Sequence, residues 1–126
     1  REQAFTAYLN RGAFKGWPEA MLADYLADGL VEDADGQGAG GFRLTCSPAW
    51  EASNYATQAH DPWRAMARFR KPIHILKGQT GSTCAIPASP RGLPHVTVET
   101  VPDTTHFLPM QSPDTARDAL FTAVNG

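Results

Sequence analysis

The sequence predicts an α/β fold in which parallel strands are flanked by helices. Two runs rich in β-branched residues, IHIL at 73–76 and VTVETV at 96–101, have the composition of strands. About twenty residues separate these runs, which is too many for a hairpin and enough for a parallel crossover. A strongly signalled helix start at Ser112 follows the second run. The second half of the chain is therefore expected to hold two parallel strands and a final helix.

The first seventy residues predict mostly short helices. An apolar stripe marks residues 2–10, and a stronger one marks 18–28, where Gly29 is placed to cap the C-terminus. The acidic, glycine-rich segment 32–41 has the composition of an exposed loop, and residues 42–46 form a short extended piece.

Three serine or aspartate residues that precede proline predict the starts of further helices. Ser47 and Asp61 each stand as an N-cap before a first-turn proline. Ser112 does the same before Pro113, with Asp114 favourably placed in the first turn of the final helix.

Composition excludes several classes of partner. The chain has 126 residues, of which 42% are hydrophobic and 19% charged, with a net charge of -2, so no nucleic-acid surface is expected. No apolar run approaches the roughly 18 residues of a membrane span. We expect a cytoplasmic protein whose partner is a small-molecule substrate, with no nucleic acid and no membrane.

The two cysteines predict neither a metal site nor a disulfide. Cys46 and Cys84 lie far apart, and neither belongs to a C-x-x-C motif or a histidine cluster. We expect reduced structural thiols, and no metal or cofactor.

Two parallel strands cannot bury both of their faces by themselves. The chain would either dimerise to complete a sheet or be the C-terminal portion of a longer polypeptide. The opening on Arg1, within a helical pattern, favours the second expectation.

The order of elements resembles the C-terminal half of an α/β-hydrolase, of the bacterial type that carries a helical cap. The segments that carry the resemblance are CSPAWEASNYATQAHDPWRAMARF, PIHILKG and VETVPDTTHFLPMQSPDTARDAL. The resemblance implies that residues 1–70 form part of the cap and that 71–126 form the C-terminal part of the core.

In this resemblance, His106 matches the catalytic histidine, which follows the last strand and precedes the last helix. An imidazole there can take the proton of a serine hydroxyl and later protonate the leaving group. The other three histidines, His60, His74 and His95, lack this context, so we interpret them as structural or surface residues.

The nucleophile is expected in the N-terminal half of the same hydrolase. The chain has no G-x-S-x-G elbow, and Ser82 in TGSTC is flanked by Thr80 and Cys84 where the motif needs glycine. Ser82 also follows the strand that normally delivers the acid, which speaks against it as nucleophile.

The usual triad acid is absent as well. Such enzymes read G-x-x-D after the PIHIL-like strand, and here Gly81 stands where the aspartate would be. Some members take the acid from an earlier strand. Within this chain, Glu51 on the cap and Asp103 near His106 remain alternatives, although Asp103 is more simply a turn residue.

Large apolar side chains near His106 are candidates for a substrate pocket. Phe107 is the predicted substrate-binding residue, with Leu108 and Met110 as further walls of an acyl or alkyl pocket. The three tryptophans, Trp17, Trp50 and Trp63, fit ordinary packing at least as well.

The sequence thus predicts an esterase-like hydrolase with a catalytic triad, acting through a covalent acyl-enzyme with His106 as general base and acid. A dehalogenase or epoxide hydrolase with an aspartate nucleophile is one alternative. A non-catalytic binding module on the same fold is another, because the G-x-x-D acid is missing.

Overall fold

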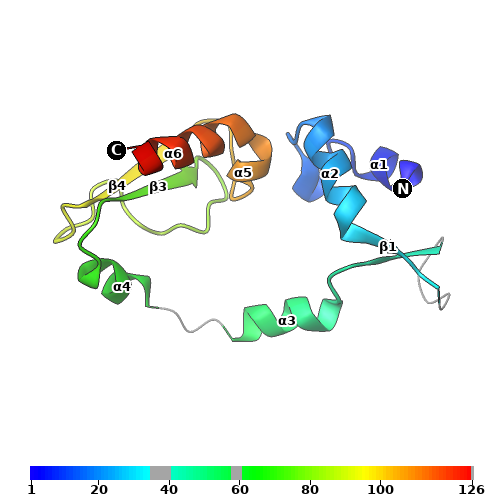
Figure 1. The fold of residues 1–126 in the computed structure, drawn as a ribbon, viewed down its shortest axis with the longest axis horizontal. Helices are drawn as coiled ribbons and strands as arrows, with labels where there is room; N and C mark the ends of the chain where they lie inside the picture. The colour runs from blue at the N-terminus through cyan, green and yellow to red at the C-terminus, as the bar shows by residue number, and fades with distance from the viewer. Residues whose placement is uncertain (35–40, 58–60, 126) are drawn as a thin grey trace. The chain divides into compact units, whose positions relative to one another are not determined.

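The computed structural model describes residues 1–34, 41–57 and 61–125. The chain forms two compact units, Arg1–His60 and Asp61–Gly126 (Figure 1). His60 and most of the predicted glycine-rich loop lie outside the described residues.

The first unit is mainly helical, as predicted. Its core is formed by buried Leu22, Leu26 and Leu30, against which partly buried side chains such as Phe5 and Phe14 pack. The elements of this unit are helix α1 (Glu2–Tyr8), a 3₁₀ turn (Gly12–Phe14), helix α2 (Glu19–Gly29), strand β1 (Leu30–Glu32), strand β2 (Phe42–Leu44) and helix α3 (Pro48–Ala56).

The end of α2 differs from the sequence expectation. Gly29 is the last residue of the helix, and Leu30 follows it directly in extended conformation, with φ −121° and ψ 123°. Leu30 is buried and opens β1, which pairs antiparallel with β2 through Val31 and Arg43. The predicted glycine cap is therefore wrong, because burial of Leu30 carries the chain straight into a strand.

Two of the predicted N-caps are confirmed, because in each a side chain accepts a hydrogen bond from a backbone N–H in the first turn of the helix. The Ser47 hydroxyl accepts a hydrogen bond from the backbone N–H of Trp50 at 3.2 Å, ahead of α3. The Asp61 carboxylate accepts one from the N–H of Arg64 at 3.1 Å and begins helix α4 (Pro62–Arg68).

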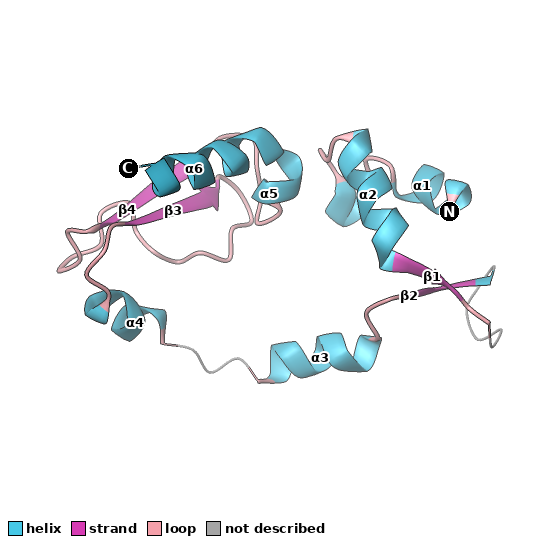
Figure 2. Cartoon of the chain, viewed as in Figure 1, coloured by secondary structure: helices cyan, strands magenta, loops and turns pink. Residues whose placement is uncertain are grey.

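The second unit contains the predicted pair of parallel strands. Strand β3 (Ile73–Gly78) and strand β4 (Val96–Val101) pair in parallel, from Ile73 opposite Val96 to Gly78 opposite Val101 (Figure 2). The turn after β4 leads into helix α5 (Leu108–Gln111) and helix α6 (Pro113–Asn125). This unit is an α/β structure, which confirms the predicted fold class.

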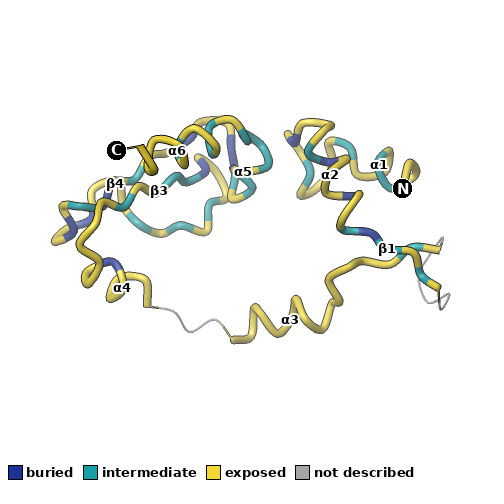
Figure 3. The backbone as a smooth tube through the Cα atoms, in the orientation of Figure 1, coloured by how far each residue is buried: buried dark blue, intermediate teal, exposed yellow. Residues whose placement is uncertain are grey.

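A buried core lies against one face of this two-stranded sheet. Met66 of α4, Leu93 and Val96 are buried together, and Ile75 and Val98 pack against them. No residue of α6 is buried among those described, and most of the helix is coloured as exposed in Figure 3. Its Leu120, Phe121 and Val124 are 70%, 61% and 82% exposed. The apolar side chains of α6 therefore lie largely in solvent.

The junction from α5 to α6 is held by side chains. Ser112 precedes Pro113 as predicted, and the backbone N–H of Ala116 donates to its carbonyl at 3.2 Å. The Ser112 hydroxyl, however, pairs with the Thr115 hydroxyl at 2.8 Å. The Ser112 side chain thus contacts the first turn of α6 through the hydroxyl of Thr115, whereas the hydroxyl of an N-cap serine accepts from a backbone N–H.

Hydrogen bonds join the residues that follow β3 to the turn that follows β4. The N–H of Thr80 donates to the carbonyl of Thr104 at 3.1 Å, and the N–H of Asp103 donates to the Gln79 side chain at 3.0 Å. Thr104 is buried, and its hydroxyl donates to the carbonyl of Val101 at 2.8 Å. Three polar groups of the turn are therefore already hydrogen-bonded: the N–H of Asp103 and the carbonyl and hydroxyl of Thr104.

Gly78 allows the two segments to approach this closely. It is buried at the last position of β3, and a Cβ built there would overlap the backbone carbonyl group of Thr105. Because that obstacle is backbone and not the tip of a flexible side chain, the turn would have to move as a whole to make room.

We predict that residues 1–126 by themselves show no cooperative thermal unfolding. The sheet edges and the exposed side chains of α6 leave apolar surface that folding of this chain does not cover. Calorimetry together with sedimentation velocity tests this. A monodisperse monomer with a sharp unfolding transition would show the prediction to be wrong.

We predict that Gly78→Ala, made in the complete protein and not in residues 1–126 alone, lowers the free energy of unfolding by about 2 kcal/mol, the cost typical of overpacking. Gly29→Ala is the matched control, because a Cβ there meets the Tyr25 ring at an ordinary 3.7 Å. Denaturant titration of both variants provides the comparison. An equal, small effect of the two substitutions would mean that the approach of Gly78 to Thr105 is not a constraint.

Candidate active site

The turn that carries His106 lies beyond the carboxyl end of β4. Parallel strands end at the same edge of a sheet, so the loop after β3 and the turn after β4 meet there. The hydrogen bond from the N–H of Thr80 to the carbonyl of Thr104 joins the loop to the turn. His106 is therefore presented at the edge where open α/β sheets generally bind ligands.

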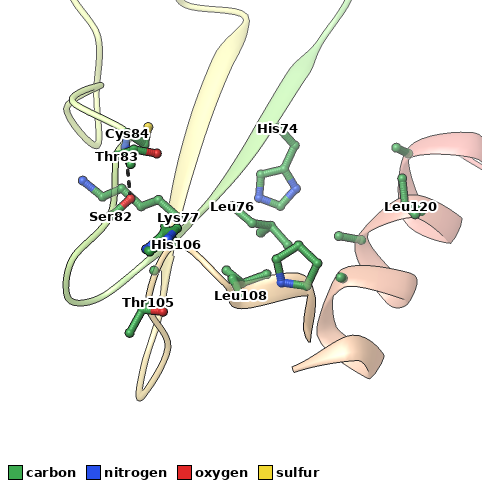
Figure 4. Close-up of a pocket in the computed structure, with 15 residues that line it drawn as sticks. His74, Leu76, Lys77, Ser82, Thr83, Cys84, Thr105, His106, Leu108 and Leu120 are labelled. Atoms are coloured by element: carbon green, nitrogen blue, oxygen red, sulfur yellow. Dashed lines mark hydrogen bonds between the residues drawn. The ribbon is translucent and has the colours of Figure 1, made fainter. Parts of the chain in front are cut away.

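A pocket of about 500 Å³ lies beside this turn (Figure 4). Its apolar wall includes Leu76 of β3, Leu108 of α5 and Leu120 of α6. Its polar lining residues include His106 and Ser82. The pocket is thus mainly apolar with a few polar groups, as is usual for small-molecule sites.

His106 itself is exposed, and its ring packs against that of Phe107. The ring centroids are 4.0 Å apart and the ring planes are tilted by 38°. Within the described residues, the imidazole has no hydrogen-bond or ion-pair partner. Both of its ring nitrogens therefore remain available to groups other than those described.

The predicted wall residues are divided between the pocket and its surroundings. Leu108 lines the pocket and is buried, whereas Phe107 and Met110 are half-buried and are not among the residues that line it. Pro109 lines it as well, and the sequence interpretation did not single it out. Phe107 as a substrate-binding residue stays a prediction.

Ser82 lies in the same pocket as His106, but its hydroxyl is already engaged. Ser82 Oγ accepts a hydrogen bond from the backbone N–H of Cys84 at 3.2 Å, which is a local turn contact. Cys84 is a half-buried free thiol on the same loop. The described residues contain no hydrogen bond between Ser82 and His106.

The two residues that remain as alternatives for the triad acid, Asp103 and Glu51, lie in different surroundings. Asp103 is exposed with φ 57°, in the left-handed region that aspartate tolerates in turns, which fits a turn residue. Gly81, at the position of the missing aspartate, also has a φ of 57°. Glu51 is exposed on α3 of the first unit.

The two other described histidines each have a partner. His74 Nε2 lies 3.2 Å from a carboxylate oxygen of Glu99 on the neighbouring strand. His95 Nε2 lies 3.0 Å from the carbonyl of Met66, near the start of β4. His95 is therefore at the opposite end of the strand from His106, in a structural contact.

The residues that hold the turn escaped the sequence interpretation. Three residues contact the segment 103–105: Gln79, Gly78 and Gln111. The contacts of Gln79 and Gly78 join distant parts of the chain, whereas Gln111 is six residues from Thr105. Their residue types are common in loops and helix ends. Only the three-dimensional pairing of β3 with β4 reveals the role of Gln79 and Gly78.

Neither a cluster of metal-ligating side chains nor a membrane-spanning helix is present among the described residues. They contain no group of three or more histidine, cysteine, aspartate or glutamate side chains that would hold a metal ion. None of the helices described there is both long enough and apolar enough to cross a membrane.

The chain is similar to a solved structure. No protein-family model matches the chain, and no curated protein matches it. The crystal structure of E-2-(acetamidomethylene)succinate hydrolase is 22% identical, with a TM-score of 0.74. The match covers 98% of the present chain and 45% of that one, so the present chain spans less than half the length of its neighbour.

The neighbour is an α/β-hydrolase, and at this level of identity the likeness concerns the fold. The match extends over nearly the whole of the present chain. The chain therefore has the fold of the C-terminal half of an α/β-hydrolase.

Proposed function

We propose that this chain is the histidine-bearing part of a hydrolase that cleaves an ester or a related bond through a covalent acyl-enzyme. The observation that carries the proposal is the position of His106. The histidine lies on a hydrogen-bonded turn at the carboxyl edge of a parallel sheet, beside a mainly apolar pocket. The name of the similar structure, a hydrolase, supports this class of chemistry at a coarse level.

In the proposed reaction His106 acts first as a base and then as an acid. It takes the serine proton as the serine oxygen bonds to the carbonyl carbon, and the imidazolium then protonates the departing alkoxide. In the second half, His106 takes a proton from water, whose oxygen attacks the acyl group. The serine oxygen leaves with that proton and the acid product is released.

The nucleophile in this proposal comes from the N-terminal half of the same hydrolase. Two observations support this: the similar structure is more than twice as long as the region matched, and the Ser82 hydroxyl is engaged by the Cys84 N–H. The free ring nitrogens of His106 fit a base that meets its nucleophile and acid from another segment.

The remaining parts of the site are assigned in the same way. We assign a small-molecule substrate to the pocket, with Leu108 in its apolar wall. Phe107, next to His106, is the proposed substrate-binding residue, and the helical segment 1–70 is proposed as part of a cap. The acid comes from an earlier strand, with Glu51 and Asp103 as the alternatives within the chain. The mechanism requires no cofactor.

Two other functions fit the same fold. An aspartate nucleophile would make the protein a dehalogenase or an epoxide hydrolase, and the residue at the upstream elbow distinguishes this case. A binding module would keep the pocket without turnover, and the missing G-x-x-D acid is the observation that favours it.

We predict that His106→Ala in the complete hydrolase lowers kcat/KM for a short p-nitrophenyl ester by about three orders of magnitude or more, since a base acts with its nucleophile as one unit. Because His106 is exposed and makes no described hydrogen bond, the melting temperature is expected to change little.

The matched control is His95→Gln, which retains a hydrogen-bond donor near Met66 and lies at the far end of β4. This control is expected to stay within about threefold of wild type. Retention of more than about a tenth of the activity by His106→Ala, a deficit under about 1.4 kcal/mol, would exclude His106 as the base.

A further inference from the structure

We infer that Gln111 is the positioning residue for His106, an inference that rests on the proposed function. Gln111 ends α5, five positions after the histidine, and its side chain reaches back to the residue that precedes His106. It would act through the backbone of the turn and would not touch the substrate.

One side-chain oxygen of Gln111 receives two hydrogen bonds from Thr105. The backbone N–H of Thr105 donates to Gln111 Oε1 at 2.7 Å, and the Thr105 hydroxyl donates to the same atom at 3.1 Å. The Thr105 hydroxyl oxygen in turn accepts the N–H of Phe107 at 3.2 Å. The residues on both sides of His106 are therefore tied to Gln111.

The chemistry of the donors fixes which Gln111 atom faces the turn. A backbone N–H can only donate, so the atom that lies 2.7 Å from Thr105 N must be the amide oxygen. The contact needs an acceptor at this position, not merely a side chain of the right size. A glutamate would supply that acceptor, and a methionine of similar length would not.

The contact matters because the opposite side of the turn is closed. Gly78 lies against the carbonyl group of Thr105, so the backbone cannot shift toward β3. Gln111 holds the same residue from the α5 side. Thr105 thus lies between Gly78 on one side and two α5 groups on the other: the Gln111 amide oxygen, and the N–H of Leu108, which donates to the Thr105 carbonyl at 3.1 Å. Of these contacts, the Gln111 side chain is the one that a side-chain substitution in α5 can remove.

Loss of the Gln111 acceptor leaves the Thr105 N–H and hydroxyl without their α5 partner, while the Leu108 N–H still binds the Thr105 carbonyl. We expect the turn to shift and to displace His106. A catalytic group displaced by about 1 Å can cost a factor of about a hundred in rate. Substrate binding in the pocket depends chiefly on its apolar walls, which Gln111 does not line. The loss should therefore appear in kcat and not in KM.

The test compares Gln111→Met with Gln111→Glu in the complete hydrolase, using p-nitrophenyl acetate. We expect Gln111→Met to lower kcat by about ten- to a hundredfold with KM changed by less than about threefold. Gln111→Glu, which keeps the acceptor, is expected to retain at least about a third of wild-type kcat.

Ser112→Ala is the matched control for stability. It removes the hydroxyl pair with Thr115 next to Gln111, and it touches neither the turn nor the pocket. This variant should keep kcat within about twofold of wild type at a temperature where all variants are folded. An equal loss of kcat in Ser112→Ala would reduce Gln111 to a general stabilising role and overturn the inference.

Other outcomes separate this inference from the proposed function. If His106→Ala abolishes turnover while Gln111→Met keeps kcat within about threefold, the inference is wrong and the proposed function stands. Equal losses in the methionine and glutamate variants would also overturn it. If His106→Ala stays active, the proposed function and this inference fall together.

Should Gln111→Met fail to fold, Thr105→Val decides the question. It keeps the β-branched shape while removing the hydroxyl that links Gln111 to the N–H of Phe107. A fall in kcat of about threefold or more with KM retained supports the inference, and an unchanged kcat overturns it.

Discussion

The close approach of β3 to the turn after β4 is the constraint on which the candidate site depends. Parallel pairing brings both strands to the same edge, and Gly78 lets the Thr105 backbone lie directly against the strand end. Thr80 and Gln79 then bind the first half of the turn, and Gln111 binds the second. His106 owes its position to these contacts because its own ring makes no hydrogen bond to any described residue.

The turn is held by hydrogen bonds while the His106 ring makes none to the described residues, and this arrangement fits the chemistry proposed for the site. A base that must meet a nucleophile from another segment needs a fixed backbone and free ring nitrogens. The surrounding pocket supplies apolar surface through Leu76, Leu108 and Leu120. The turn therefore holds the histidine firmly while leaving its reactive atoms uncommitted.

Much of this architecture was predictable because the decisive signals are local. The β-branched runs, their spacing and the proline-preceded caps at Ser47 and Asp61 follow from neighbouring residues alone. Gly29 was misread because the burial of Leu30, a tertiary effect, overrides the local signal for a glycine cap. Gln79 and Gly78 were missed because their partners lie over twenty residues away.

The most direct test of the account is the distance from His106 to a nucleophile in a crystal structure of the complete hydrolase. The account predicts a serine oxygen from another segment about 3 Å from a ring nitrogen of His106, with the Gln111 contact to Thr105 retained. A structure in which the His106 ring is hydrogen-bonded only to structural groups, with no nucleophilic side chain within about 6 Å, would contradict it.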